Sequence, residues 1–223
     1  MEQTYNNFEI KTSEKYINYA EAIQYMQERV NDILNKKEKE LVWFLCHDHI
    51  YTCGTSSNKK EILLKKNIPI INSNRGGKTT YHGPGQRIIY LMIDLNKRKK
   101  DIRKFIDLIE KSIISLLKNL HVESTSFRNR VGIWVTKANG LTLTREKKIG
   151  AIGLRIKKWV TYHGLSFNLN PDLSYYDYIQ ACGLADYSST SLEELGINLS
   201  QKEFDKLFTN IFNKNLHSIY LNG

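Results

Sequence analysis

The chain has 223 residues, of which 41% are hydrophobic and 25% charged, and its formal net charge is +10 at pH 7. These proportions are ordinary for a soluble globular protein. The longest apolar runs have the length of a strand, so the sequence contains no transmembrane candidate. The first residues carry an acid and several amides but no apolar core of a secretory signal. We therefore expect a cytoplasmic protein with no membrane partner.

The cysteines and the charge limit the possible partners. An odd number of cysteines, Cys46, Cys53 and Cys182, with no C-x-x-C argues against a disulfide framework. The positive charge would suit a nucleic acid, an anionic membrane or an acidic protein. Because the basic residues are scattered and form no long tail, nucleic-acid binding has little support.

The first half of the chain predicts one helix and three strands. Ala20, Ile23, Met26, Val30 and Ile33 recur at helical spacing. The apolar run 41–46 predicts a central strand, and 68–71 predicts another, with Pro69 marking its start or a sheet edge. A glycine-rich polar segment follows, and 87–95 predicts a mostly buried strand.

The second half predicts further helices and paired strands. An apolar stripe from Ile102 to Leu120 predicts a helix that begins near Asp101. The chain then predicts a strand at 131–135, a turn at Asn139-Gly140, paired strands at 148–156 and 159–169, a loop at 170–183, and a capped helical turn at 190–195 closed by Gly196.

The chain ends in a predicted amphipathic helix with Phe204, Leu207, Phe208, Ile211 and Phe212 on one face. No repeat or linker divides the sequence. We therefore expect residues 1–223 to form one α+β domain, in which helices pack on a mixed or largely antiparallel sheet.

The segment Arg75-Gly-Gly-Lys-Thr-Thr-Tyr-His-Gly-Pro-Gly-Gln86 is the most informative stretch. Its glycines permit close approach of another molecule to the backbone, and its polar side chains supply hydrogen bonds. A polar turn attached to a rigid strand is a common form of binding site. The alternative is a glycine-rich hairpin that binds no ligand.

Cys182 and Lys148 are the candidates for chemistry. Cys182 lies in a predicted loop directly before Gly183, whereas Cys46 ends an aliphatic run and fits a structural role. A reactive cysteine needs a lowered pKa or a nearby base. Lys148 opens a strand of small and apolar residues and could be that base; the alternative is a surface lysine beside Lys147.

Other titratable residues give weaker signals. Cys46, His47, His49 and Cys53 have ligand types that suit zinc, but adjacent residues of a strand point to opposite faces and no second ligand pair follows. His82 and His163 both occur in Tyr-His-Gly. Either could be a general base or a loop brace, and we favour the brace for His163.

The glycine-rich segment resembles the signature of the lipoyl(octanoyl) transferases, the octanoyltransferases of lipoate biosynthesis. Collinear matches extend the resemblance over about residues 41 to 197: 148–153, 159–165, 167–170, 172–174, 182–183 and 190–192. The segment His49–Gly54 also matches, with Ile50 in place of a proline, and Lys78 and Leu91 replace commoner residues. The resemblance implies an α+β fold shared with lipoate and biotin protein ligases.

The resemblance also implies residue roles. Cys182 would be the acyl-thioester nucleophile, and Lys148 the lysine that activates it. The matched acyl-substrate-binding positions are Arg75, Gly76, Gly77, Lys78, Thr79, Thr80, Tyr81, His82, Ala151, Ile152, Gly153, Gly164, Leu165 and Ser166.

The implied activity is transfer of an octanoyl group from octanoyl-acyl carrier protein to a lysine of lipoyl domains, the first step of endogenous protein lipoylation. The acceptors would be the lipoyl domains of 2-oxoacid dehydrogenase complexes and the glycine cleavage H protein. Because a thioester already activates the acyl group, no ATP, metal or other cofactor is required. Acidic carrier and lipoyl domains would also fit the positive charge.

Two alternatives remain at this stage. A lipoate- or biotin-protein ligase shares the fold but adenylates its acid with ATP and needs no nucleophilic cysteine. The continuation Thr80–Gln86 and Cys182 both favour the transferase. A nucleic-acid-binding module without catalysis is supported by the net charge alone.

Overall fold

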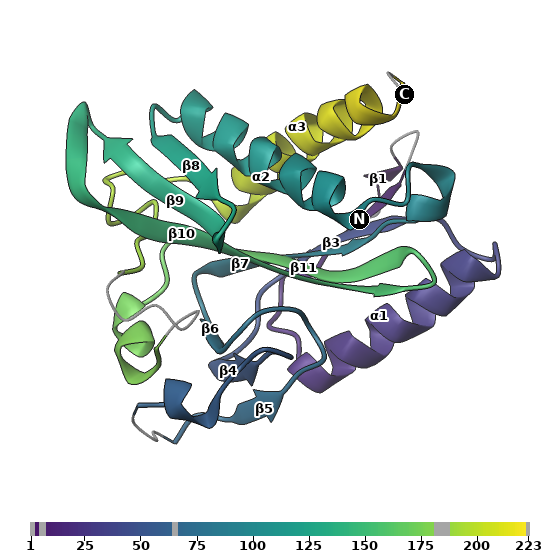
Figure 1. The fold of residues 1–223 in the computed structure, drawn as a ribbon, viewed down its shortest axis with the longest axis horizontal. Helices are drawn as coiled ribbons and strands as arrows, with labels where there is room; N and C mark the ends of the chain where they lie inside the picture. The colour runs from purple at the N-terminus through teal and green to yellow at the C-terminus, as the bar shows by residue number, and fades with distance from the viewer. Residues whose placement is uncertain (1–2, 5–7, 64–66, 181–187, 222–223) are drawn as a thin grey trace.

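The structure, a computed structural model, describes residues 3–4, 8–63, 67–180 and 188–221 (Figure 1). Its strands are β1 (Gln3–Thr4), β2 (Glu9–Thr12), β3 (Leu41–Leu45), β4 (Ile50–Cys53), β5 (Ile70–Asn72), β6 (Thr80–His82), β7 (Gln86–Met92), β8 (Glu123–Phe127), β9 (Arg130–Ala138), β10 (Leu141–Lys157) and β11 (Val160–Asn168). Its α-helices are α1 (Tyr19–Leu34), α2 (Ile102–Asn119) and α3 (Gln201–Leu221). None of these described helices combines the length and apolar composition needed to span a membrane.

The described strands form two sheets. The larger has the order β1-β2-β3-β7-β11-β10-β9-β8, in which β2 and β3 are parallel and the other neighbours antiparallel. The smaller has the order β5-β4-β6, with β4 and β5 parallel. The predicted α+β class with a mixed sheet is confirmed. As Pro69 indicated, β5 is an edge strand and begins directly after that proline.

Helices cover both faces of the larger sheet, with α2 and α3 on one face and α1 on the other (Figure 1). Strand β3 shows how the core divides. Val42 and Phe44 join the cluster that contains α2 and α3, whereas Trp43 and Leu45 join the cluster that contains α1. Because both faces of β3 are covered, all five of its residues are buried, which explains its continuous apolar run.

The helices begin where the sequence supplies caps. The Asn18 side chain accepts hydrogen bonds from the first backbone N–H groups of α1, and Asp101 does the same for α2. The expected stripe of α1 needs one correction, because Ala20 is exposed and Ala22 is buried in its place. In α2 the predicted apolar face is confirmed.

β9 and β10 are longer than the strands predicted at 131–135 and 148–156, whereas β11 is one residue shorter at each end than the strand predicted at 159–169. β10 begins at Leu141 rather than Lys148, directly after the turn at Asn139 and Gly140, whose φ angles are 52° and 76°. The predicted pairing of β10 with β11 is confirmed. In the turn after residue 190, Leu195 N donates to Ser191 O at 3.2 Å and Gly196 has a φ of 72°, as expected for a helical turn closed by glycine.

A buried ion pair attaches α3 to the centre of the sheet. The Arg87 guanidinium, 1% exposed, donates to both carboxylate oxygens of Asp205, at 2.9 and 2.5 Å. Arg87 also donates to Cys46 Sγ at 3.7 Å, and Gln201 donates to the same sulfur at 3.4 Å. Burial raises the pKa of the Cys46 thiol, in agreement with a structural role.

Replacement of one partner of this pair should destabilise the fold strongly. In the Asp205→Asn variant a buried guanidinium loses its countercharge, and we expect the free energy of unfolding to fall by about 3–5 kcal/mol. Urea denaturation monitored by circular dichroism measures the change. The control is Glu123→Gln, which removes one partner of the exposed Lys137–Glu123 pair and should cost no more than about 1 kcal/mol. Equal effects of the two substitutions would contradict a special contribution of Arg87 and Asp205.

Candidate functional site

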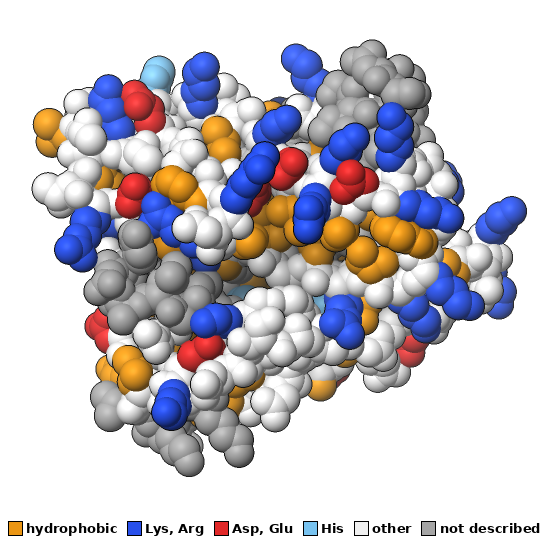
Figure 2. All heavy atoms as spheres, in the orientation of Figure 1, with side chains coloured by type: hydrophobic (Ala, Val, Ile, Leu, Met, Phe, Trp, Pro, Cys, Tyr) orange, Lys and Arg blue, Asp and Glu red, His pale blue; other side chains and the backbone are white. Residues whose placement is uncertain are grey.

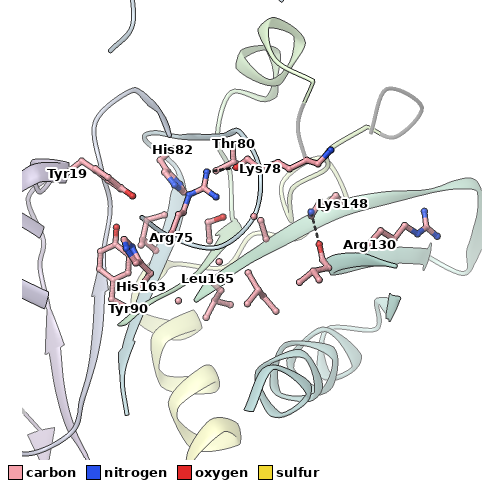
Figure 3. A pocket seen from close by; sticks show the side chains of 18 of the residues that line it. Tyr19, Arg75, Lys78, Thr80, His82, Tyr90, Arg130, Lys148, His163 and Leu165 are labelled. Carbon is pink, nitrogen blue, oxygen red and sulfur yellow. Dashed lines mark hydrogen bonds between the residues drawn. The ribbon is translucent and has the colours of Figure 1, made fainter. Parts of the chain in front are cut away.

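A cavity of about 200 Å³ lies where the glycine-rich segment faces β10 and β11 (Figure 3). Its walls are formed by the start of α1, the glycine-rich segment, β7, the β8–β9 hairpin, β10 and β11. The lining residues are Tyr19, Arg75, Gly77, Lys78, Thr80, His82, Ile88, Tyr90, Asn129, Arg130, Val131, Lys148, Ala151, Ile152, Gly153, His163, Gly164, Leu165 and Ser166.

Most of the binding positions expected from the sequence meet at this cavity, and Gly76, Thr79 and Tyr81 lie behind its wall. Because alternate residues of a strand face opposite sides, Thr80 and His82 line the cavity while Tyr81 points away. Tyr81 stacks on Tyr175, with ring centres 4.9 Å apart. The N–H of Thr79 donates to Glu61 Oε2 at 2.9 Å.

Two glycines let the segment lie directly on β10. Gly76 N donates to Leu154 O at 3.2 Å. A Cβ on Gly76 would come within 3.0 Å of Leu154 O, and a Cβ on Gly153 within 2.9 Å of Gly76 O. Neither position has room for a side chain without separation of the two backbones, so these glycines hold the cavity wall in place.

Arg75 braces the segment from inside. Its guanidinium is buried and donates to Thr52 Oγ1 and O, to Gly76 O and to Lys78 O, at 2.6 to 3.0 Å. These bonds fold the segment around the arginine side chain. Burial is the main cause of the low pKa of His82 and of His163, and the positive charge of Arg75 lowers both further.

The histidines at the cavity are neutral braces. Burial, followed by neighbouring positive charge, lowers the pKa of His163 to about 3 and that of His82 well below its ordinary value. His163 Nε2 lies 2.8 Å from Asn74 Oδ1, and His82 Nδ1 lies 2.7 Å from Gln86 Oε1. Rings with such low pKa values are weak bases at neutral pH, so the contact of His163 is the brace expected from the sequence.

Lys148 is a buried lysine in the cavity wall, only 8% exposed. Its Nζ donates to Val131 O at 2.9 Å and lies 5.2 Å from the centre of the Trp134 ring (Figure 3). The alternative of a surface lysine is wrong for Lys148 and describes Lys147, whose Nζ pairs with Glu194 at 2.9 Å. A buried amine in the wall of a cavity is in position to exchange protons with a bound substrate.

Cys182 and Gly183 lie outside the described residues, but the chain on both sides of their segment is described. On one side Gln180 N donates to Glu61 O at 2.7 Å. On the other side Lys148 N donates to Ser188 O at 2.9 Å, and Thr190 N donates to Lys148 O at 2.8 Å. The described chain therefore resumes at Ser188 against the backbone of Lys148.

The possible zinc set does not converge. His47 Nδ1 lies 2.7 Å from Ile17 O and its Nε2 2.7 Å from Tyr90 Oη, so both ring nitrogens are engaged. Cys46 bonds Arg87 instead. Within the described ranges no three His, Cys, Asp or Glu side chains form a group that could hold a metal ion.

Several cavity residues were not expected from the sequence. Ile88 and Tyr90 share one face of β7. Their two-residue spacing within a predicted strand is a signal that places both side chains on the same side of the sheet. Tyr19, Asn129 and Arg130 reach the cavity only through tertiary packing. No local pattern indicates them.

Comparison with known proteins agrees with this fold. The structure superposes with a TM-score of 0.69 on the bipartite lipoate protein ligase of Thermoplasma acidophilum, at 13% identity over 96% of this chain and 85% of that chain. It superposes with a TM-score of 0.65 on a lipoate-protein ligase A bound with ATP, at 15% identity over 93% of this chain and 85% of that one. The family model of the lipoyl protein ligase A/B catalytic domain matches residues 18–213, and the chain belongs to this family.

Within the family, similar curated sequences include octanoyltransferases. The octanoyltransferase of Ehrlichia chaffeensis is 44% identical over 212 residues, which are 95% of this chain and 97% of that protein. The octanoyltransferase of Bartonella tribocorum is 42% identical over 92% of this chain and 86% of that protein. The resemblance drawn from the sequence is thereby confirmed, together with the ligase-like fold.

The buried histidines should make the fold sensitive to acid. Burial lowers the pKa of His163 to about 3, whereas a histidine in the unfolded chain has a pKa of about 6.5. Between these values the unfolded chain binds a proton that the folded chain does not, so stability falls as pH falls from about 6.5. Urea denaturation of His163→Gln should show a loss between pH 7 and pH 5 that is smaller than the wild-type loss by about 2 kcal/mol. Identical losses in both proteins would contradict a neutral buried His163.

Proposed function

We propose that this chain is an octanoyltransferase that moves an octanoyl group from octanoyl-acyl carrier protein to a lysine of a lipoyl domain through a thioester on Cys182. The observation that carries the proposal is the burial of Lys148 in the wall of the cavity, where its backbone also pairs with the chain that follows Cys182. The octanoyltransferase relatives support the acyl group and the class of reaction.

In the first half of the proposed reaction, Lys148 removes the proton of the Cys182 thiol, and the thiolate attacks the thioester carbonyl carbon of the donor. A bond forms between this carbon and the Cys182 sulfur, and the bond to the carrier sulfur breaks. The proton held by Lys148 passes to the carrier sulfur, which leaves as a thiol. The Gly183 N–H would stabilise the oxyanion.

In the second half, the amine of the acceptor lysine attacks the acyl-enzyme carbonyl. The new C–N bond is an amide, the Cys182 sulfur leaves, and the proton lost by the amine returns to that sulfur through Lys148. Because the donor is already a thioester and the product amide is more stable, the reaction needs no ATP, metal ion or other cofactor.

The cavity wall supports the proposed acyl site. The β10 and β11 segments 151–153 and 164–166 present small and aliphatic groups, and Thr80 and His82 face them from β6. We assign the 11 proposed positions that line the cavity to substrate contact. The remaining three, Gly76, Thr79 and Tyr81, would act by holding the wall.

The surface supports acidic protein partners. Figure 2 shows lysine and arginine side chains spread over this face with fewer acidic ones between them, around a hollow bordered by hydrophobic side chains. With a net charge of +10, acidic carrier and lipoyl domains would be attracted to the chain. The acceptors would be the lipoyl domains of 2-oxoacid dehydrogenase complexes and the glycine cleavage H protein, and the single catalytic domain 1–223 would act in the cytoplasm.

Intact-mass spectrometry tests the nucleophile and the donor together. With octanoyl-acyl carrier protein and no ATP, the wild type should gain one octanoyl adduct, and the Cys182→Ala variant should gain none. Cys53→Ala is the matched control: Cys53 is buried and is not among the residues that line the cavity, so its removal should leave the adduct intact. Acylation of a lipoyl domain only with octanoate and ATP would establish a ligase instead.

Removal of the Lys148 amine should make the thiol less reactive. A nearby amine favours the thiolate by accepting the proton and by its positive charge. We therefore expect the pH midpoint of Cys182 alkylation by iodoacetamide to rise in Lys148→Ala, and the rate of acyl transfer to fall by about 100-fold or more. Lys147→Ala, which removes the exposed neighbour, should change neither quantity. An unchanged alkylation profile in Lys148→Ala would exclude Lys148 as the base.

A further inference from the structure

Lys148 reaches its position by crossing the neighbouring strand. Its Cα is paired with Trp134 of β9, and its side chain runs back along β9 so that Nζ donates to Val131 O at 2.9 Å. Between these two residues lies Gly132. A Cβ there would come within 2.4 Å of Lys148 Cε and 3.0 Å of Nζ. The lysine side chain therefore occupies the space that any other residue at position 132 would fill.

The backbone at Gly132 is also unusual. Its φ is 131°, a conformation that residues with a side chain rarely adopt. β9 and β10 shift register at this point, between Lys148 and Gly150. A Cβ on Gly132 would also approach Gly150 O to 2.7 Å. The irregular pairing and the missing side chain together leave room for the Lys148 side chain to cross β9.

The Trp134 ring lies against the Lys148 amine. Lys148 Nζ lies 5.2 Å from the centre of the Trp134 ring, within the range of a cation–π interaction. The ring is itself fixed, because Trp134 Nε1 donates to Arg130 O at 3.1 Å and the ring is 1% exposed. The amine is thus held by a carbonyl on one side and an aromatic face on another.

From this arrangement we propose that Gly132 and Trp134 are positioning residues for the proposed reaction. Gly132 provides the passage that brings the Lys148 amine to the cavity, and Trp134 keeps it there. Neither residue lines the cavity, and both act through Lys148. The inference rests on the proposed function, because it assigns these residues to the base of that reaction.

Other charges near Lys148 contribute to any pH profile. The Arg130 guanidinium lies 4.6 Å from the Trp134 ring and pairs with Glu146 of β10 at 3.3 Å. Lys78 lines the same cavity from the glycine-rich segment and pairs with Glu61 at 3.7 Å. Behind β9 is the buried Glu110 carboxyl of α2, which interacts with the Ser126 side chain and the Gly132 N–H. The substitutions below leave all of these charges in place.

The first test is Gly132→Ala, with Gly140→Ala as the matched control. Gly140 lies in the turn after β9 and also has a positive φ, 76°, but a Cβ there would meet nothing within 4 Å. Both variants carry backbone strain, and only Gly132→Ala displaces Lys148. We expect Gly132→Ala to raise the pH midpoint of Cys182 alkylation and to lower kcat by about 10-fold to 100-fold with little change in KM, while Gly140→Ala keeps the wild-type profile.

A second pair of variants works even if Gly132→Ala does not fold. Trp134→Phe and Trp134→Leu both lose the bond from Nε1 to Arg130 O, and only Trp134→Phe keeps an aromatic face over Lys148. The alkylation midpoint should rise in Trp134→Leu and return most of the way to the wild-type value in Trp134→Phe. A merely structural role would leave the midpoint unchanged in both.

The outcomes separate this inference from the proposed function. If Lys148→Ala shifts the alkylation profile but Gly132→Ala and Trp134→Leu do not, the positioning role is overturned and the base assignment stands. If Lys148→Ala itself leaves the profile unchanged, the proposed function fails and the positioning role fails with it. A parallel shift in Lys148→Ala, Gly132→Ala and Trp134→Leu supports both.

Discussion

The site depends on one close contact between two backbones, where Gly76 lies against β10 at Gly153 and Leu154. This contact fixes one wall of the cavity relative to the large sheet, and it is possible only because neither glycine carries a side chain. The buried Arg75 then wraps the following residues around its guanidinium. With that wall in place, the alternation of β6 decides which side chains face the cavity and which pack behind it.

The interior of the cavity combines fixed polar groups with small apolar surfaces. His82 and His163 are neutral and are bonded to Gln86 and Asn74, so neither competes for the substrate's proton. The Arg75 guanidinium donates its hydrogen bonds to backbone and threonine oxygens. The proposed function assigns proton transfer to Lys148, whose amine is held by Val131 O and the Trp134 ring.

The sequence predicted those parts of the site that depend on local patterns of spacing and residue type. The glycine-rich segment, the strands that carry Lys148 and Leu165, and the helices α1 and α2 all follow from spacing and residue type. The sequence did not indicate Tyr19 as a cavity residue, because the pattern of its helix predicted only a core-facing stripe. The sequence did not indicate Arg130 either, because it lies on a hairpin that was not predicted. The first strand of this hairpin, β8, is the polar segment Glu-Ser-Thr-Ser-Phe with no apolar alternation. Such residues are set by tertiary packing, which a single sequence does not encode locally.

The double backbone pairing of Lys148 with Ser188 and Thr190 has a consequence for how this chain can diverge. Both bonds to residues 188–190 are made by the main chain of Lys148, so they do not depend on the side chain at position 148. A substitution there can therefore remove the amine and leave this attachment of the chain in place.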